Sequence, residues 1–168
     1  MRLLFIGDSL IEYFNWQEQF QKNLVYNMGV AGETAEGLYA RLEVVYSQVE
    51  EPDAVFIMAG INNLAMGDRK FVATYHKIVR SLKERYPSSR IFVQSLLPVL
   101  FPWISNDEIR DINRELKKIA DTEKLIYLDI HSLFLERGKP LRDYLMDDGV
   151  HVSEKGYLAW SREIEKYL

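Results

Sequence analysis

The segment Leu3–Leu10, with the sequence LLFIGDSL, begins with four consecutive apolar residues and continues with a glycine, an aspartate and a serine. A short apolar run without alternation is typical of a strand that is covered on both faces. Gly, Asp and Ser favour turns and helix starts. The segment therefore predicts a buried strand that ends in a tight turn, with Ser9 at the start of a helix.

Four more apolar runs of similar length follow, separated by stretches with helical periodicity. The five predicted buried strands are Leu3–Ile6, Val25–Met28, Ala54–Met58, Ile91–Ser95 and Leu125–Leu128. Strands that alternate with helices are the signature of βαβ units and a parallel sheet. The sequence therefore predicts an α/β fold: a three-layer α/β/α sandwich with a five-stranded parallel sheet, in the flavodoxin-like order 2-1-3-4-5.

Four apolar stripes recur every three or four residues and predict amphipathic helices. They are Leu38, Leu42, Val45 and Val49; Phe71, Tyr75, Ile78, Val79, Leu82 and Tyr86; Ile109, Ile112, Leu116 and Ile119; and Tyr157, Trp160, Ile164 and Leu168. A weaker helix is expected around residues 12–22. Thr34 and Ser153 are expected to cap helices, and Ser105 with Glu108 has the spacing of a capping box.

Length and composition suit one globular domain over residues 1–168, with a net charge of −4. Lys and Arg are scattered and form no basic patch, so we expect no nucleic-acid partner. No stretch reaches the roughly 18 apolar residues that span a bilayer. The absence of cysteine and of a signal-like apolar run predicts a cytoplasmic protein. A homodimer is compatible with the sequence but is not predicted by it.

Chemically versatile residues follow several of the predicted strands. Ser9 follows the first strand, Gly32 follows the second, and Asn62 and Asn63 follow the third. In open parallel sheets, ligands bind beyond the carboxyl ends of the strands, so these residues should share one edge. Near the C-terminus, Asp148 and His151 stand three residues apart across a glycine. Together these positions offer a nucleophile, a base, an acid that orients the base, and donors for an oxyanion.

Each of these signals, taken alone, is also explained by turn or capping chemistry. Asp129 and His131 form a second conceivable acid–base pair, although their spacing places no turn between them. Asp147 could replace Asp148 as the acid. It is the combination of the signals at one edge of the sheet that favours catalysis over ordinary turn structure.

The same residues resemble the GDSL/SGNH hydrolase family, whose members carry Ser, Gly, Asn and His in separate blocks. Residues 7–10 match the first block, Gly32 resembles the glycine of the second, and Asn62 matches the asparagine of the third. The last block, D-x-x-H, resembles the version found in members similar to platelet-activating-factor acetylhydrolase and to carbohydrate acetylesterases. One position departs from the pattern: Asn63 stands where the family usually has Asp. It keeps the capacity for hydrogen bonds but lacks the charge.

The resemblance implies a catalytic triad of Ser9 as nucleophile, His151 as base and Asp148 as orienting acid. It also implies an oxyanion hole built from the N–H groups of Ser9 and Gly32 and the side-chain amide of Asn62. This chemistry needs no metal and no organic cofactor. The resemblance therefore predicts a serine esterase or acylhydrolase that acts on a small-molecule ester.

The short chain leaves little room for a large lid, so we expect a short acyl group such as acetyl. Lysophospholipase, thioesterase and acyltransferase activities of the same family remain alternatives, as does a non-catalytic flavodoxin-like binding module. Phe101 and Trp103, in the aromatic loop after the fourth strand, are candidate substrate contacts. Asp8 is a further candidate, although we expect it chiefly to order the turn. Tyr13 is expected to serve helix packing.

Overall fold

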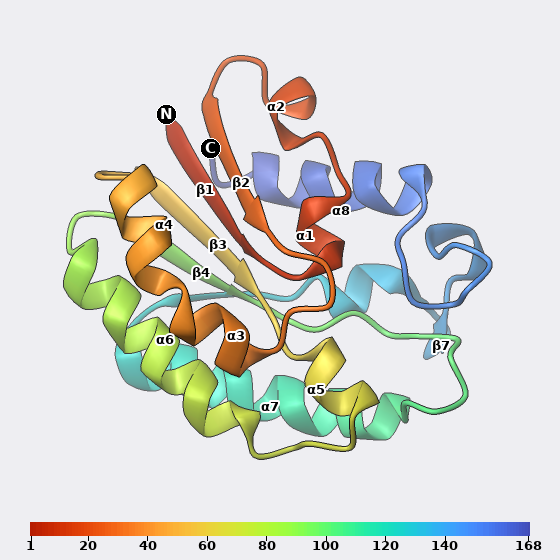
Figure 1. Cartoon of the computed structure of the whole chain (residues 1–168). Helices are drawn as coiled ribbons and strands as arrows, with labels where there is room; N and C mark the ends of the chain where they lie inside the picture. The colour runs from red at the N-terminus through yellow and green to blue at the C-terminus, as the bar shows by residue number, and fades with distance from the viewer.

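The computed structural model describes all residues from 1 to 168 and contains a five-stranded sheet in the order β2-β1-β3-β4-β5 (Figure 1). The strands are β1 (Arg2–Gly7), β2 (Leu24–Gly29), β3 (Ala54–Met58), β4 (Arg90–Gln94) and β5 (Ile126–Leu128). Every neighbouring pair is parallel. The predicted parallel sheet and its strand order are therefore confirmed.

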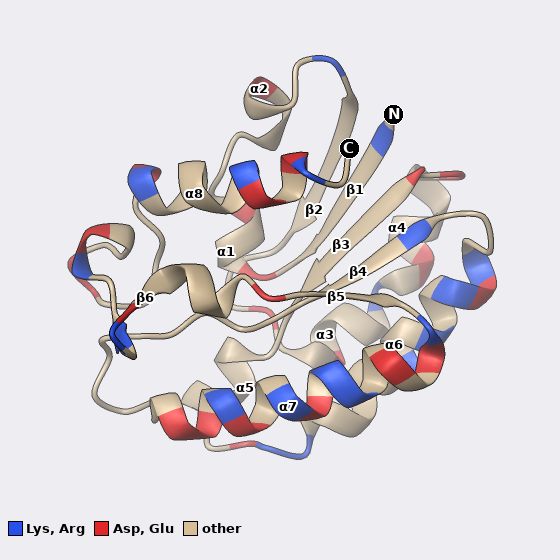
Figure 2. Ribbon diagram, turned by 180° about the vertical axis from the view of Figure 1, so that it is seen from behind, with Lys and Arg blue, Asp and Glu red and all other residues tan.

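Helices cover both faces of the sheet and complete three layers (Figures 1 and 2). One face carries α1 (Ser9–Glu12), α2 (Trp16–Gln19) and α8 (Glu154–Glu165). The other carries α3 (Ala35–Ala40), α4 (Leu42–Gln48), α6 (Phe71–Arg85) and α7 (Asn106–Glu123). The short α5 (Ile61–Ala65) follows β3. The α/β/α sandwich is confirmed, and no helix has the length and apolar character needed to cross a bilayer.

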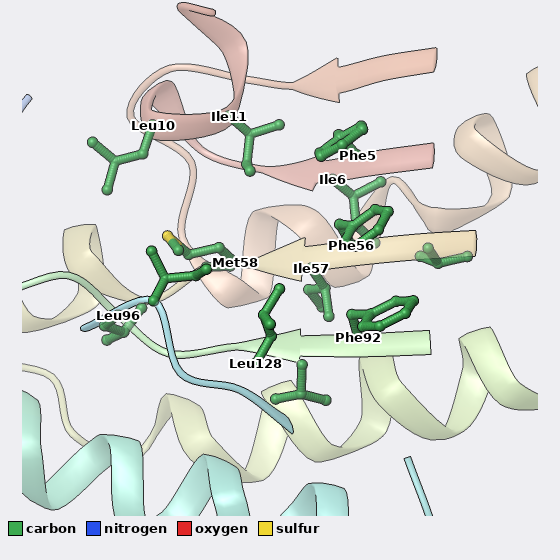
Figure 3. Close-up of a cluster of buried hydrophobic side chains, with 14 of the residues drawn as sticks. Phe5, Ile6, Leu10, Ile11, Phe56, Ile57, Met58, Phe92, Leu96 and Leu128 are labelled. Carbon is green, nitrogen blue, oxygen red and sulfur yellow. The ribbon is translucent and has the colours of Figure 1, made fainter. Parts of the chain in front are cut away.

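The centre of the core is a row of stacked phenylalanines on adjacent strands. Phe5 pairs in register with Phe56, and Phe56 pairs with Phe92. Their ring centroids lie 4.8 and 4.6 Å apart, and Figure 3 shows the three rings in a row across β1, β3 and β4. Offset or stacked aromatic pairs add to the stabilisation from burial. This row joins the central strands into one rigid platform beneath the loops at their carboxyl ends.

The edge strands differ from the prediction that all five strands are buried. All residues of β3 are buried, whereas β2 has no buried residue and β5 has only one, Leu128. An edge strand has a neighbour on one side only, so its residues keep more contact with solvent. Apolar composition alone does not reveal which strand lies at an edge.

Two of the predicted helices are interrupted. The stripe from Leu38 to Val49 is divided between α3 and α4 at Arg41, whose guanidinium donates to the Glu33 carboxylate and to the Met28 carbonyl. The region predicted as one helix over residues 12–22 forms α1 and α2 instead, with residues 13–15 between them. Between α1 and α2, the Asn27 side-chain amide donates to backbone carbonyls of this segment. In both places, side-chain bonds to groups outside the helix compete with helical continuity.

The helix starts agree with the sequence, including Ser105 at the start of α7, but the capping box predicted there does not form. Thr34 and Ser153 accept hydrogen bonds from the N–H groups three residues later, as expected of caps. Ser105 accepts from the Asp107 N–H at 3.2 Å rather than from Glu108. The carboxylate of Glu108 pairs with Arg69 in a neighbouring loop, so the predicted capping box does not form.

The chain after β5 forms short elements that the sequence analysis did not predict. They are η1 (His131–Phe134), β6 (Leu135–Glu136), β7 (Lys139–Pro140) and η2 (Arg142–Tyr144). They lead into α8, where the Tyr157 hydroxyl donates to the Leu10 carbonyl at 2.9 Å. This contact holds the first turn of α8 against α1, beside the carboxyl end of β1.

Candidate active site

Ser9 is the first residue of α1, directly beyond the carboxyl end of β1. The turn requires glycine at position 7, because φ is +155° and a Cβ there would lie 1.9 Å from the Met58 carbonyl oxygen. Asp8 caps α1 by accepting a 3.0 Å hydrogen bond from the Leu10 N–H. The N–H of a first helical residue has no acceptor within the helix. The turn therefore presents the Ser9 hydroxyl and a free N–H at one point.

Ser9, His151 and Asp148 are joined by hydrogen bonds in that order. The distance from Ser9 Oγ to His151 Nε2 is 3.1 Å, and that from His151 Nδ1 to Asp148 Oδ2 is 2.6 Å. A proton on Nδ1 donates to the carboxylate, which leaves the Nε2 lone pair facing the hydroxyl. The structure thus brings together the three residues that the sequence analysis proposed as a triad, although Ser9 and His151 are 142 positions apart.

Asp148 is held in its ionised form. Its partial burial favours the neutral acid, but the hydrogen bonds from the His151 ring and from the N–H groups of Val150 and His151 outweigh this, so that the pKa falls to about 2. Both backbone bonds reach Asp148 Oδ1 at 2.9 Å. Oδ2 is left to accept from the imidazole. The carboxylate therefore carries its charge where an imidazolium would form.

The loop that bears Asp148 and His151 is anchored at two places. A β-bridge between Leu145 and Val152 closes its base. The Leu100 N–H donates to the Gly149 carbonyl at 2.7 Å, which ties the loop to the segment that follows β4. Gly149 has a φ of +74°, and a Cβ on it would lie 2.9 Å from the carbonyl carbon of Leu100. Only glycine allows this close approach of the two segments.

Asn62 and Gly32, the other predicted oxyanion donors, lie on adjoining segments. Asn62 Nδ2 donates one hydrogen to the Glu33 carbonyl at 2.9 Å, which leaves its second hydrogen available. Gly32 is exposed, adopts a φ of +75°, and its N–H has no acceptor within the chain. Together with Ser9, these residues offer three N–H groups without an acceptor, the kind of donor that stabilises an oxyanion.

A small cavity of about 280 Å³ opens beside the Ser9 hydroxyl. The residues that line it are Ser9, Ile61, Asn62, Ala65, Phe101, Ile104, Asp148, Val150 and His151. Four of these residues, the Ser9–His151–Asp148 group and Asn62, are polar, and the other five are apolar. The arrangement offers an apolar recess for an acyl chain next to a nucleophile.

Of the three predicted substrate contacts, only one lines the cavity. Phe101 lines the cavity, whereas Trp103 is 79% exposed and lies outside its lining. Asp8 is fully buried beneath Ser9 and does not line the cavity either. One oxygen of Asp8 caps α1 and the other, Oδ2, has no partner. Burial raises the pKa of Asp8 to about 7. We therefore assign a capping role to Asp8 and do not retain it as a substrate contact.

Tyr13 has a position that the sequence analysis missed. Its ring centroid lies 5.3 Å from that of the His151 imidazole, and the residue is 59% exposed rather than packed into the core. Tyr13 follows Ser9 by four residues, the spacing that places two side chains on one helix face. This spacing of four residues was the signal in the sequence that could have placed Tyr13 near Ser9. The ring lies beside the imidazole but is not among the residues that line the cavity.

The alternative acid–base residues do not assemble. His131 is 6% exposed, and its Nε2 has no partner. The Asp129 carboxylate accepts from the Ser132 backbone and hydroxyl instead of from His131. The Asp147 side chain points to Arg142, at 3.5 Å. Only the Asp148–His151 pair therefore reaches a nucleophilic side chain.

A hydroxyl, an imidazole and a carboxylate in this order, beside free N–H donors at the carboxyl edge of a parallel sheet, make up the constellation of a serine hydrolase. Within that class, the amino-acid sequence identifies a particular family. Residues 5–159 match the GDSL-like Lipase/Acylhydrolase family, and the chain belongs to it. The resemblance seen in the sequence motifs is thereby confirmed, and the chain is a hydrolase of carboxylic esters.

Individual relatives agree with this membership. The chain is 26% identical over 175 residues to the human platelet-activating factor acetylhydrolase IB subunit alpha1. The aligned region covers 99% of this chain and 74% of the relative. A Streptococcus pneumoniae structure described as a platelet activating factor has a TM-score of 0.87 at 25% identity, over 98% of this chain and 82% of its own. A variant of an acetyl-xylooligosaccharide esterase from Geobacillus shares the fold, with a TM-score of 0.81 at 24% identity, over 98% and 92% of the two chains.

Proposed function

We propose that this protein is a serine esterase that removes short acyl groups, above all acetyl, from small-molecule esters through an acyl-enzyme on Ser9. The observation that carries the proposal is the 3.1 Å hydrogen bond from Ser9 Oγ to His151 Nε2. It joins a nucleophile to a base within the reach that proton transfer needs. The capping and turn roles of these residues do not require that contact.

In the first half of the reaction, Ser9 Oγ attacks the ester carbonyl carbon while His151 Nε2 takes the hydroxyl proton. The Asp148 carboxylate stabilises the imidazolium that results, without taking a proton itself. When the tetrahedral intermediate collapses, the bond to the leaving alcohol breaks and His151 returns the proton to the alcohol oxygen. The products of this half are a free alcohol and an acyl-Ser9 ester.

The negative charge of the tetrahedral intermediate falls on the former carbonyl oxygen. The N–H groups of Ser9 and Gly32 and the free hydrogen of Asn62 Nδ2 supply the donors for it. A single donor of this kind typically lowers the barrier by about 2.7–4 kcal/mol. In the second half, His151 deprotonates a water molecule that attacks the acyl-Ser9 carbonyl. The bond between the acyl carbon and Ser9 Oγ then breaks, His151 returns the proton to Oγ, and the acid product leaves.

The preference for a short acyl group rests on the size of the recess. The cavity of about 280 Å³ lies near the lower limit of the roughly 300–1,000 Å³ found for small-molecule sites. Ile61 and Ile104, which form part of its apolar wall, are each 4% exposed and packed against the core. The names of two similar proteins, the platelet-activating factor acetylhydrolase and the acetyl-xylooligosaccharide esterase, likewise specify an acetyl group.

The test is a chain-length series of 4-nitrophenyl esters, from acetate through butyrate to octanoate, with kcat/KM measured for each. We expect the acetate to be the best substrate and Ser9→Ala to abolish turnover of all of them. A kcat/KM that rises with chain length would favour the lysophospholipase or thioesterase alternative instead. Equal turnover by wild type and Ser9→Ala would refute the serine mechanism.

A second arm separates hydrolysis from acyl transfer. Methanol or glycerol is added to the acetate reaction, and the acetylated alcohol is measured against free acetate. We expect water to remain the main acceptor at millimolar alcohol. His151→Ala provides a further control, because loss of the base should reduce turnover as severely as loss of the nucleophile.

A further inference from the structure

Asn63 is buried, with 2% exposure, and all of its side-chain hydrogen-bonding groups are occupied. Its Oδ1 accepts from the Ala35 N–H at 2.9 Å. Its Nδ2 donates to Glu36 Oε2 at 2.8 Å and to Asp68 Oδ2 at 3.0 Å. A buried polar group with every partner in place holds its surroundings firmly, because breaking any one bond leaves an unsatisfied atom.

These bonds connect the two segments that carry oxyanion donors. Asn63 adjoins Asn62 in α5, while Ala35 and Glu36 form the first turn of α3, immediately after the segment of Gly32. Asn62 adds a parallel connection through its bond to the Glu33 carbonyl. The distance between the Gly32 N–H and the Asn62 amide is therefore set through side chains of α5.

The chemistry around Nδ2 requires a donor at position 63. Glu36 and Asp68 both present carboxylate oxygens, which accept hydrogen bonds but cannot donate them when ionised. The burial of Glu36 raises its pKa, but the hydrogen bonds it accepts, first among them that from Asn63, lower the pKa by more. A carboxylate at position 63 would face two others and would have no hydrogen to offer.

We propose that Asn63 is a positioning residue that aligns the oxyanion donors Gly32 and Asn62, and that its amide is matched to the carboxylates of Glu36 and Asp68. The inference rests on the proposed function, since it concerns the hole that stabilises the acylation intermediate. In this chain the neighbours of position 63 already supply the negative charge.

The experiment compares Asn63→Asp with a triple variant in which the polarity of the cluster is reversed: Asn63→Asp with Glu36→Gln and Asp68→Asn. In the triple variant, two amide donors converge on one carboxylate, and the bond from the Ala35 N–H is kept. Rates on 4-nitrophenyl acetate are expressed per titrated active site, so that misfolded protein does not count. A boronic acid that forms a tetrahedral adduct on Ser9 reports on the hole directly.

For Asn63→Asp we expect kcat to fall about 10- to 100-fold with little change in KM, because oxyanion donors act mainly in the transition state. The inhibition constant of the boronic acid should rise by a comparable factor. In the triple variant, both quantities should return to within about threefold of wild type. Asn113→Asp is the matched control: Asn113 is a buried amide that binds both backbone groups of Leu96, so the change should lower the Tm but spare kcat.

Wild-type kcat in Asn63→Asp, or a loss that the triple variant does not restore, would overturn the inference. If Asn63→Asp does not fold, the triple variant decides: folding with restored kcat supports the matched polarity, and any other outcome contradicts it. The amide NMR shift of Gly32 gives a readout independent of turnover, expected to move in Asn63→Asp and to return in the triple variant. If the wild-type protein has no esterase activity, the proposed function is refuted. The Gly32 amide shift then still tests whether Asn63 aligns Gly32 with Asn62.

Discussion

At the scale of single residues, the carboxyl groups of Asp8, next to Ser9 in the chain, and of Asp148, which binds His151, have opposite environments. Asp148 accepts three hydrogen bonds and has a pKa of about 2, whereas Asp8 is wholly buried with one unpartnered oxygen and a pKa of about 7. Burial disfavours the charged form of a carboxyl group, and hydrogen bonds to the charged form favour it. Residue type alone does not distinguish the two roles.

Asp148→Asn should lower kcat on 4-nitrophenyl acetate by roughly 10³- to 10⁴-fold, because an amide cannot hold the imidazole tautomer or stabilise the imidazolium. Asp147→Asn is the matched control. Its carboxyl group is adjacent in sequence but points to Arg142, so its kcat should stay within twofold of wild type. If Asp147→Asn loses activity and Asp148→Asn keeps it, the assignment of Asp148 as the acid is wrong.

Tyr13→Leu should lower kcat by about two- to fivefold and leave the Tm nearly unchanged. The tyrosine ring lies 5.3 Å from the imidazole and is largely exposed, so it can stabilise the imidazolium by about 0.5–1 kcal/mol without contributing much to the core. Tyr13→Phe retains the ring and should behave like wild type. A loss of equal size in the Phe variant would point to the hydroxyl and not to the ring.

At the scale of elements, the site depends on short loops that each need a glycine. Gly7 turns β1 into α1, and Gly149 lets the loop of Asp148 and His151 lie against Leu100. Each loop is anchored to a different part of the sheet edge. Their relative position therefore follows from the strands beneath them.

Gly149→Ala and Gly138→Ala form a matched pair that separates backbone strain from contact. Both glycines have positive φ, but a Cβ at Gly138 meets nothing within 4 Å, while one at Gly149 would collide with Leu100. Each change should cost about 1 kcal/mol through the left-handed backbone. Only Gly149→Ala should also shift His151 and reduce kcat, by about tenfold or more. Chemical denaturation and steady-state kinetics measure the two effects separately.

At the scale of the whole molecule, one hydrophobic core supports a site assembled from both ends of the chain. The buried cluster includes residues from Leu3 to Ile164. Asp8, which precedes Ser9 in the chain, is fully buried, and its burial makes the stability of the fold depend on the titration of this carboxyl group.

Asp8→Asn should therefore change the pH dependence of unfolding. The pKa of Asp8 is raised from 3.8 to about 7 by folding, so the native state holds the proton more tightly and Asp8 destabilises the fold increasingly as pH rises from about 4 to 7. The stability advantage of Asp8→Asn over wild type should grow by about 2–3 kcal/mol between pH 5 and pH 8. Urea denaturation at both pH values tests this, with the exposed Asp147→Asn as control. An advantage independent of pH would contradict it.

Much of the fold was predictable because its signals are local. Each central strand is a continuous apolar run, and most helices carry a clear apolar stripe. The interruption at Arg41 was not predictable, because it depends on bonds to Glu33 and Met28 that form only when β2 and α3 are in place. The partial exposure of β2 and β5 likewise depends on which strands have two neighbours.

The sequence by itself determined the secondary structure of the central sheet and the turn before Ser9, because residues a few positions apart meet through local geometry. Only the tertiary structure decided that Asp148 and not Asp147 pairs with His151, and that Ser9 lies 3.1 Å from the same imidazole. The size of the recess, the burial of Asp8 and the partners of Asn63 were decided in the same way. Each of these features results from packing between segments that are distant in the sequence. They form only when the whole core is assembled, so no single stretch of the chain specifies them.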